Sequence, residues 1–371
     1  MGQLRVLHCI ASMGGGGAER QLAYLSLGLV RLGWDVQVAL TRGGPNLDAL
    51  CTSGSAIHYL SRGAASMFRQ LTQIIRSGRP DVVQTWLPKM DIVGGLAARI
   101  SGARWVLSER SSGGLYPVTA RNTARAWLGA GADAIIANSA RGLEYWRTRV
   151  RDPQRLRVIP NAVPLPDGPI GTAADIEKLG IPGHHRVLLY VGRLDNEKNA
   201  LTLMRGFELV LRSSADVTAV ICGDGPLKER IASAVQQTAL GNRILLPGYV
   251  HEVWPWMKRA DVFANMSLCE GRPNAVLEAM GCGCPLAVSD IPEHRELLDC
   301  RSAVFADPTS PESIAEAIWA VLRHPLAAAE RAARAQATVQ NWSIDFVAGQ
   351  YGAAYLDLIA SARPGLARAL N

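Results

Sequence analysis

Two glutamates separated by seven residues are the side chains whose types and spacing first suggest chemistry. Glu270 and Glu278 belong to residues 269–297, which read CEGRPNAVLEAMGCGCPLAVSDIPEHREL. The run ADVFANM at 260–266 is short and apolar, which is typical of a buried parallel strand, and residues 275–280 are good helix formers. A second apolar strand is expected at 285–289. This part of the chain is therefore predicted to fold as strand, acidic loop, helix and strand.

The start of the predicted helix could bind phosphate oxygens. Pro273 suits a first helical position, and a helix start presents free backbone N–H groups and a positive dipole end. Glu278 lies about a turn and a half inside the helix, so it could accept two hydrogen bonds from a neighbouring diol. Glu270 stays on the loop. A diphosphate with a ribose on one side and a sugar on the other fits this layout.

Two cations five residues apart follow the strongest strand pattern of the second half of the chain. The run RVLLYVG at 186–192 is followed by RLDNEKN, which contains Arg193 and Lys198. At the end of a parallel strand, both side chains could reach a diphosphate. The alternative is two solvated charges on a loop.

These segments resemble the retaining GT-B glycosyltransferases of family 4. EGRPNAVLEAMGCGCP at 270–285 is similar to their donor-site signature, and VGRLDNEKN at 191–199 to their phosphate-binding segment. GDGPLKERI at 223–231 resembles a turn near the nucleotide base, and GGGGAER at 14–20 the first loop of the family. The resemblance covers essentially the whole chain. It implies an α/β GT-B fold, in which two doubly wound Rossmann-like domains face a central cleft.

The resemblance also implies roles for individual residues. Arg193 and Lys198 would stabilise the departing diphosphate, Glu270 would hold sugar hydroxyls, and Glu278 the ribose hydroxyls. The departing phosphate itself would deprotonate the acceptor, and no nucleophile for a covalent intermediate stands out. The implied donor-binding residues are Gly16, Gly17, Arg193, Lys198, Gly225, Leu227, Val250, Glu270, Gly271, Arg272, Pro273, Asn274 and Glu278.

In the first half, polar residues at the ends of three expected strands are predicted to face the acceptor, because ligands bind along the carboxyl edge of open α/β sheets. Relatives often carry a histidine after the strand at 80–85, but this chain reads QTWLPKMD there. Trp86 could stack on a sugar or simply pack, and Asn138 or Ser139 could merely cap a helix. Residues 111–125 are predicted as a basic acceptor-side loop. The acceptor-side candidates are Trp86, Glu109, Arg110 and Asn138.

Strands and helices alternate along both halves, which predicts two domains. Residues 1–163 are expected to form an acceptor-binding domain and residues 164–342 a nucleotide-sugar-binding domain, with a proline-rich linker at 162–169. A last helix is expected from about residue 343 to 371, with Phe346 or Val347, Tyr351, Tyr355 and Ile359 on one face. The resemblance implies that this helix crosses back onto the first domain.

The net charge of +7 is unevenly distributed. Residues 1–163 hold 20 Lys and Arg against 9 Asp and Glu, a net charge of +11, and the remainder carries −4. A basic half could contact an anionic membrane or a phosphorylated lipid acceptor, or could simply be an arginine-rich surface. No nucleic-acid-binding motif is recognisable. The seven scattered cysteines favour free thiols in a reducing cytoplasm.

The predicted function is transfer of a sugar, with retention, from a nucleotide diphosphate sugar, with uridine as the usual base, to a glycan or lipid-linked hydroxyl in polysaccharide or glycolipid biosynthesis. No Asp-x-Asp pair occurs, so neither a metal nor another cofactor is expected. The expected location is the inner face of the cytoplasmic membrane. The alternatives are a GT-B sugar-nucleotide epimerase, a phosphorylase, or a basic protein that binds nucleic acid or membranes.

Overall fold

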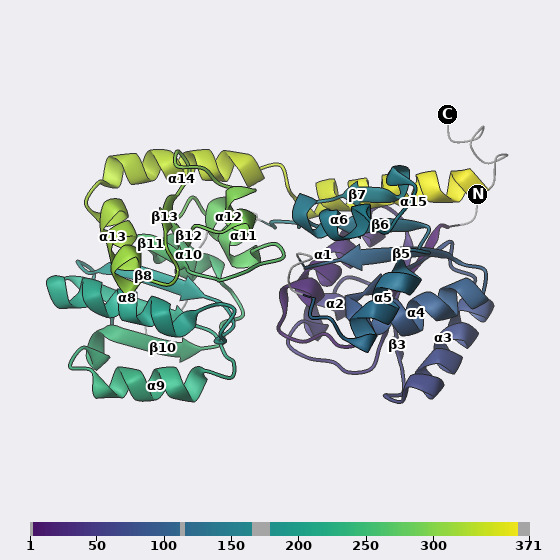
Figure 1. Cartoon of the computed structure of the whole chain (residues 1–371), viewed down its shortest axis with the longest axis horizontal. Helices are drawn as coiled ribbons and strands as arrows, with labels where there is room; N and C mark the ends of the chain where they lie inside the picture. The colour runs from purple at the N-terminus through teal and green to yellow at the C-terminus, as the bar shows by residue number, and fades with distance from the viewer. Residues whose placement is uncertain (1–2, 112–115, 165–178, 363–371) are drawn as a thin grey trace. The chain divides into compact units, whose positions relative to one another are not determined.

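Buried apolar strands alternate with helices through residues 3–111, 116–164 and 179–362, the parts of the chain that the computed structural model describes (Figure 1). The chain divides into unit 1, residues 1–164 with 342–371, and unit 2, residues 165–341. Much of the predicted linker, residues 112–115 of the predicted loop at 111–125 and the end of the predicted last helix lie outside the described residues. The functional assignment of the two units stays a prediction.

Unit 1 is built on a parallel sheet with the strand order β3-β2-β1-β4-β5-β6-β7. Val6 of β1 pairs with Val36 on one side and Val82 on the other, so the chain reverses its direction of travel across the sheet between β1 and β4. The strands are β1 (Arg5–Cys9), β2 (Asp35–Leu40), β3 (Ala56–Tyr59), β4 (Val82–Trp86), β5 (Arg104–Glu109), β6 (Ala134–Ala137) and β7 (Leu156–Val158).

Helices cover both faces of this sheet, because successive strand residues point to opposite sides. Val6 and Val36 face α1 and α15, whereas Leu7 and Val83 face α3 and α4. The helices of unit 1 are α1 (Gly17–Arg31), α2 (Leu47–Cys51), α3 (Ala64–Gly78), α4 (Leu87–Ile100), α5 (Ala120–Gly129), α6 (Ala140–Arg147) and α15 (Ile344–Ala362), with a 3₁₀ turn at Pro153–Arg155.

Helix α15, far from the rest of unit 1 in sequence, packs against α1 (Figure 1). Its buried stripe is Val347, Tyr351, Tyr355 and Ile359, while Phe346 is exposed. Tyr351 accepts a hydrogen bond of 2.8 Å from Arg110 Nη2, and Tyr355 donates one to Gln84. The last helix is therefore tied to the sheet of unit 1 by polar as well as apolar contacts.

Unit 2 contains a second parallel sheet, with the order β10-β9-β8-β11-β12-β13. Helices α8 and α13 pack on one face, and α10 and α11 on the other. Its strands are β8 (Arg186–Val191), β9 (Val217–Cys222), β10 (Ile244–Gly248), β11 (Val262–Asn265), β12 (Leu286–Ser289) and β13 (Val304–Ala306). Its helices are α8 (Ala200–Ser213), α9 (Lys228–Gln237), α10 (Trp254–Arg259), α11 (Asn274–Gly281), α12 (Pro292–Arg295), α13 (Pro311–Leu322) and α14 (Pro325–Val339), with a 3₁₀ turn at Gly241–Arg243.

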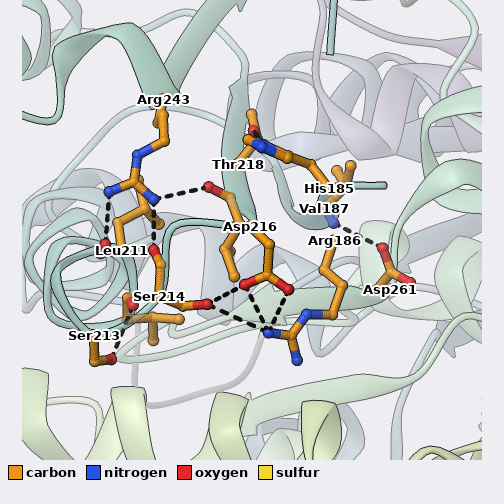
Figure 2. A network of polar contacts seen from close by, with 12 residues as sticks. His185, Arg186, Val187, Leu211, Ser213, Ser214, Asp216, Thr218, Arg243 and Asp261 are labelled. Atoms are coloured by element: carbon orange, nitrogen blue, oxygen red, sulfur yellow. Dashed lines mark hydrogen bonds and ion pairs between the residues drawn. The ribbon is translucent and has the colours of Figure 1, made fainter. Parts of the chain in front are cut away.

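A polar network stabilises the amino ends of the strands of unit 2 (Figure 2). Arg243 donates to the carbonyls of Leu211 at 2.7 Å and Ser214 at 2.6 Å, so it satisfies acceptors at the end of α8. Arg186 pairs with Asp216 at 3.2 Å, and Asp261 accepts from the backbone N–H of Val187. These contacts tie the amino edge of the sheet together. The carboxyl edge carries the predicted donor residues.

The prediction of a loop at 111–125 is wrong for its C-terminal part, where α5 begins. Thr119 accepts a hydrogen bond from the backbone N–H of Asn122 and so caps this helix. Arg125 is fully buried and forms ion pairs of 2.6 Å with Asp91 and 3.0 Å with Glu109. The segment reads as a loop because Asn122 and Arg125 of α5 point into the protein, so the usual pattern of a surface helix is missing.

One buried cation shared by two buried carboxylates makes the stability of unit 1 depend on pH. Burial raises the pKa of Asp91 to about 6, although Arg125 opposes the rise. The folded state therefore binds a proton that the unfolded chain releases above about pH 4, so the free energy of unfolding falls as pH rises to about 6, by about 3 kcal/mol in all.

Hydrogen exchange of the β4 and β5 amides across a urea titration, repeated between about pH 4 and 6, measures this change for unit 1 alone. The Asp91→Asn variant cannot take up the proton, and its stability should lack this part of the pH dependence. Equal pH dependence in the two proteins would contradict the assignment.

Candidate functional site

The predicted donor residues of unit 2 follow strands that meet where the order of the sheet reverses. β8 has β9 on one side and β11 on the other. The loop after β8 leads into α8 on one face, and the loop after β11 leads into α11 on the other. A crevice forms outside the carboxyl ends of two strands at such a switch point, and ligands bind there in open α/β sheets.

An ion pair bridges these two loops. Lys198, in the loop after β8, places its Nζ 2.6 Å from both carboxylate oxygens of Glu270, in the loop after β11. The backbone N–H of Leu268 also donates to the carbonyl of Glu197 at 2.8 Å. Glu270 is buried, and Lys198 is partly exposed. A cation and an anion separated by about seventy residues are thus held together at the switch point.

The backbone around Lys198 is shaped by its neighbours. Asp195 accepts a hydrogen bond of 2.8 Å from the N–H of Lys198. Asn199 adopts a left-handed conformation with φ of 55°, which asparagine tolerates better than most residues, and its amide donates to the carbonyl of Pro308 at 2.6 Å. The tight turn directs Lys198 toward Glu270 before α8 begins.

A chain of hydrogen bonds that sequence reasoning missed supports Glu270 from the other side. Ser267 lies 2.7 Å from Glu270 Oε1, and Ser289 donates to the Ser267 carbonyl at 2.7 Å. His294 Nδ1 lies 2.9 Å from the Ser289 carbonyl. Burial lowers the pKa of His294, so the imidazole stays neutral and can donate from Nδ1. The polar residues that end β11 and β12 were the available signal for this chain.

The start of α11 lies directly after Glu270. The helix begins at Asn274. Pro273 is therefore the N-cap residue, whereas the sequence suggested that it is the first residue of the helix. Glu278 is buried within this helix. Arg272 Nη1 forms an ion pair of 3.0 Å with Glu296, and burial lowers the pKa of Arg272. The guanidinium of Arg272 is therefore already bound within unit 2.

Glycines bring the loop after β9 close to the loop after β8. A side chain at Gly225, whose φ is 156°, would stand 2.5 Å from the carbonyl oxygen of Leu194. Leu194 in turn donates to the carbonyl of Asp224 and accepts from the N–H of Leu227. Gly225 is thus required by the close approach of two backbones. Leu227 is the N-cap of α9 and packs against the core of the unit.

The remaining donor candidates of unit 2 occupy the same edge. Arg193 is 67% exposed and pairs loosely with Asp195 at 3.4 Å. Val250 follows β10 and is half-buried, as is Gly271 in the loop after β11. The structure therefore collects Arg193, Lys198, Gly225, Leu227, Val250 and residues 270–274 at the carboxyl ends of neighbouring strands.

In unit 1, two acceptor-side predictions need correction. Trp86 has no exposed surface; its indole donates to His8 Nδ1 at 3.3 Å, and Arg110 stacks over the ring at 4.2 Å. Glu109 is buried too, where it accepts from Trp146 and pairs with Arg125. Both side chains end their strands at the expected edge but turn into the core, so neither presents a surface to an acceptor.

The other predicted residues of unit 1 keep an open role. Arg110 is partly exposed and donates to Asn161 Oδ1 at 2.9 Å as well as to Tyr351. Ser139, not Asn138, caps α6 by accepting from the N–H of Gly142. Gly16 is the N-cap of α1 and Gly17 its first residue. Their predicted donor contacts stay predictions.

Two family models match the chain. "Glycosyltransferase Family 4" matches residues 15–166, and "Glycosyl transferases group 1" matches residues 185–324, so together they cover most of the sequence. The chain belongs to glycosyltransferase family 4. The resemblance inferred from the Glu-x7-Glu stretch is therefore confirmed.

Solved structures show that this family member has the GT-B fold. HepE from Anabaena, in complex with UDP and glucose, superposes with a TM-score of 0.82 at 19% identity, over 96% of this chain and 100% of that one. Sucrose-phosphate synthase from Thermosynechococcus elongatus superposes with a TM-score of 0.77 at 19% identity, over 97% of this chain and 100% of that one. The predicted fold class is confirmed.

Curated relatives in the family match over shorter stretches. The UDP-Gal:alpha-D-GlcNAc-diphosphoundecaprenol alpha-1,3-galactosyltransferase of Escherichia coli is 30% identical over 236 residues, 60% of each chain. The N-acetylgalactosamine-N,N'-diacetylbacillosaminyl-diphospho-undecaprenol 4-alpha-N-acetylgalactosaminyltransferase of Campylobacter jejuni is 30% identical over 160 residues, 43% of this chain and 42% of its own length. The match thus spans about half the length of these relatives.

The described residues of this family member contain no cluster of three or more His, Cys, Asp or Glu side chains that could hold a metal ion. None of the helices in the described ranges is both long and apolar enough to cross a bilayer.

The ion pair between the two loops should be measurable as a coupling energy. Lys198→Met removes the ion-pair partner of a buried carboxylate, which should cost about 2–3 kcal/mol. Glu270→Gln removes that charge, so the double variant should recover part of the loss. Urea unfolding of the two single variants and the double variant gives the coupling. If the losses of stability in the two single variants simply add in the double variant, the predicted coupling is wrong. As a control, Lys228→Met, at an exposed ion pair, should leave stability unchanged.

Proposed function

We propose that the protein transfers a sugar, with retention at the anomeric carbon, from a UDP-sugar to a hydroxyl of a glycan or lipid-linked acceptor in polysaccharide or glycolipid biosynthesis. The observation that carries this proposal is the pairing of Lys198 with Glu270 beside the start of α11. A cation, a carboxylate that can accept hydrogen bonds from hydroxyls, and a helix start lie near one switch point. These are the groups that a sugar diphosphate requires.

The barrier to sugar transfer lies in departure of the diphosphate, which gathers negative charge as the bond to the sugar breaks. Lys198, Arg193 and the N–H groups at the start of α11 would stabilise that charge. When the diphosphate binds, the Lys198 ammonium group would leave the Glu270 carboxylate and donate to phosphate oxygens, because it cannot hydrogen-bond both groups fully. Glu270, still held by Ser267, would then accept hydrogen bonds from the sugar hydroxyls.

The other donor contacts follow from position. Glu278, buried inside α11, would accept hydrogen bonds from the ribose hydroxyls. The base would bind after β9 and β10, where Gly225, Leu227 and Val250 lie. The positive side chains and the helix start supply the charge that a divalent ion supplies in other transferases. The transfer is therefore proposed to need no metal.

The choice of uridine and of a lipid-linked acceptor rests on the relatives. The Escherichia coli relative is named for a UDP-galactose donor and a diphosphoundecaprenol acceptor, and the HepE structure contains UDP. A net charge of +11 in residues 1–163 fits a protein that works against anionic lipid at the inner face of the cytoplasmic membrane.

Thermal unfolding in the presence of UDP-, GDP- and ADP-sugars tests the donor. UDP-sugars should raise the melting temperature, and Glu278→Ala should lower that rise, because the ribose loses its carboxylate partner. Each variant is compared with its own ligand-free melting temperature, and Glu316→Ala, an exposed glutamate on α13, serves as the matched control.

The active donor is then offered with a lipid-linked acceptor in the presence of EDTA, and the anomeric configuration of the product is read by NMR. A product with the donor's configuration supports retention. An inverted product, or loss of transfer in EDTA, would refute that part of the proposal. An unchanged melting temperature with every nucleotide sugar would refute the donor site itself.

A further inference from the structure

Helix α5 buries two polar side chains and exposes three apolar ones, beside the exposed Arg121 and Thr123. Asn122 and Arg125 point inward, whereas Ala120, Ala124 and Trp127 face solvent. These three residues are spaced i, i+4 and i+7, so they form one stripe along the helix. Trp127 is 77% exposed, and Val118, just before the helix, is 99% exposed. We call Val118, Ala120, Ala124 and Trp127 the α5 stripe.

The fold prevents this helix from rolling its apolar stripe inward. Arg125 is held by the two buried carboxylates of Asp91 and Glu109. At the end of the helix, Gly129 lies against the ring of Trp146, where any side chain would come within 2.5 Å of ring carbons. A half turn of α5 would break both contacts. The α5 stripe is therefore fixed at the surface.

The elements next to the α5 stripe expose arginines. Arg121 is exposed on α5 itself, and Arg147, Arg149 and Arg151 are exposed at the end of α6. The segment that leads into α5 contacts α6: the ring of Tyr116 lies 5.3 Å from that of Tyr145, and the Arg149 guanidinium stacks over Tyr145 at 3.9 Å. The exposed acidic residues in this part of α6 and the loop after it are Glu144 and Asp152, so positive charge prevails.

We propose that the α5 stripe inserts into the headgroup region of an anionic bilayer, with the neighbouring arginines against the lipid phosphates. Tryptophan favours this region because its ring is apolar and its N–H is polar. Each arginine near an anionic surface adds attraction. A second copy of the chain fits less well, since a symmetric contact would bring like-charged arginines together. The short stripe makes the binding weak and reversible.

This inference rests on the proposed function, because a lipid-linked acceptor is reached at a bilayer surface. The chain enters α5 from the carboxyl end of β5, the edge at which ligands of such sheets bind. Docking through Val118 and Trp127 would therefore hold this edge of unit 1 close to the lipid headgroups.

Tryptophan fluorescence can test the docking directly. All nine tryptophans lie in described residues, and Trp127 is the exposed one among them. Vesicles of phosphatidylglycerol should shift the tryptophan emission to shorter wavelength and reduce its quenching by iodide. Phosphatidylcholine vesicles should have a much smaller effect on both. Trp127→Phe should abolish the spectral change while retaining most of the binding.

Co-sedimentation with the same vesicles measures affinity. Trp127→Ser should weaken binding at least about tenfold, from the loss of buried apolar surface. Arg147→Gln and Arg151→Gln should each weaken it about fivefold. Leu326→Ser, which changes an 83% exposed leucine on α14 of unit 2, should bind like the unaltered chain.

Equal binding of Trp127→Ser and Leu326→Ser would overturn the inference, as would a dimer in solution that Trp127→Ser dissociates while vesicles fail to bind. Thermal stabilisation by UDP-sugars, measured on the same samples, separates the two claims. Stabilisation without vesicle binding would refute only the docking surface, and vesicle binding without stabilisation would refute only the donor site.

Discussion

The ion pair between Lys198 and Glu270 is the contact around which the proposed donor site of unit 2 is arranged. It joins the loops after β8 and β11, the two strands between which the order of the sheet reverses. Asp195 and Asn199 shape the turn that carries the lysine, and Ser267 and Ser289 support the glutamate. Burying a charge pair here costs desolvation free energy. A bound donor could offset that cost if its diphosphate pairs with Lys198 and its sugar hydroxyls donate to Glu270.

The remainder of each unit can be understood as support for such edges. In unit 2, Arg186, Asp216 and Arg243 tie the amino ends of the strands, leaving the carboxyl ends to the loops that carry Lys198 and Glu270. In unit 1, Arg125 holds α4, α5 and the end of β5 together through Asp91 and Glu109. The cost of burying that cluster is an apolar helix face turned to solvent. The α5 stripe is therefore a consequence of how this charged cluster is buried.

The sequence predicted the elements that local pattern encodes. β8, β11 and β12 lie within the apolar runs predicted as strands at 186–192, 260–266 and 285–289, because strands buried on both faces are continuous apolar runs. α5 was missed because its polar side faces inward. Trp86 and Glu109 were misassigned because strand position does not reveal a side chain's direction at the edge. The Ser267–Ser289–His294 chain depends on contacts between distant residues, for which no local motif exists.

The most direct test of the proposed donor site is the affinity of UDP, measured by isothermal titration in EDTA. Lys198→Met should weaken binding about tenfold or more, because the diphosphate loses a charged donor. Lys258→Met, an exposed lysine on α10, should leave the affinity unchanged. Glu270→Gln should strengthen it, since Lys198 is then released from a competing carboxylate and UDP carries no sugar for Glu270 to hold. Equal affinities for the Lys198→Met and Lys258→Met variants, or weaker binding by Glu270→Gln, would contradict the arrangement proposed for this site.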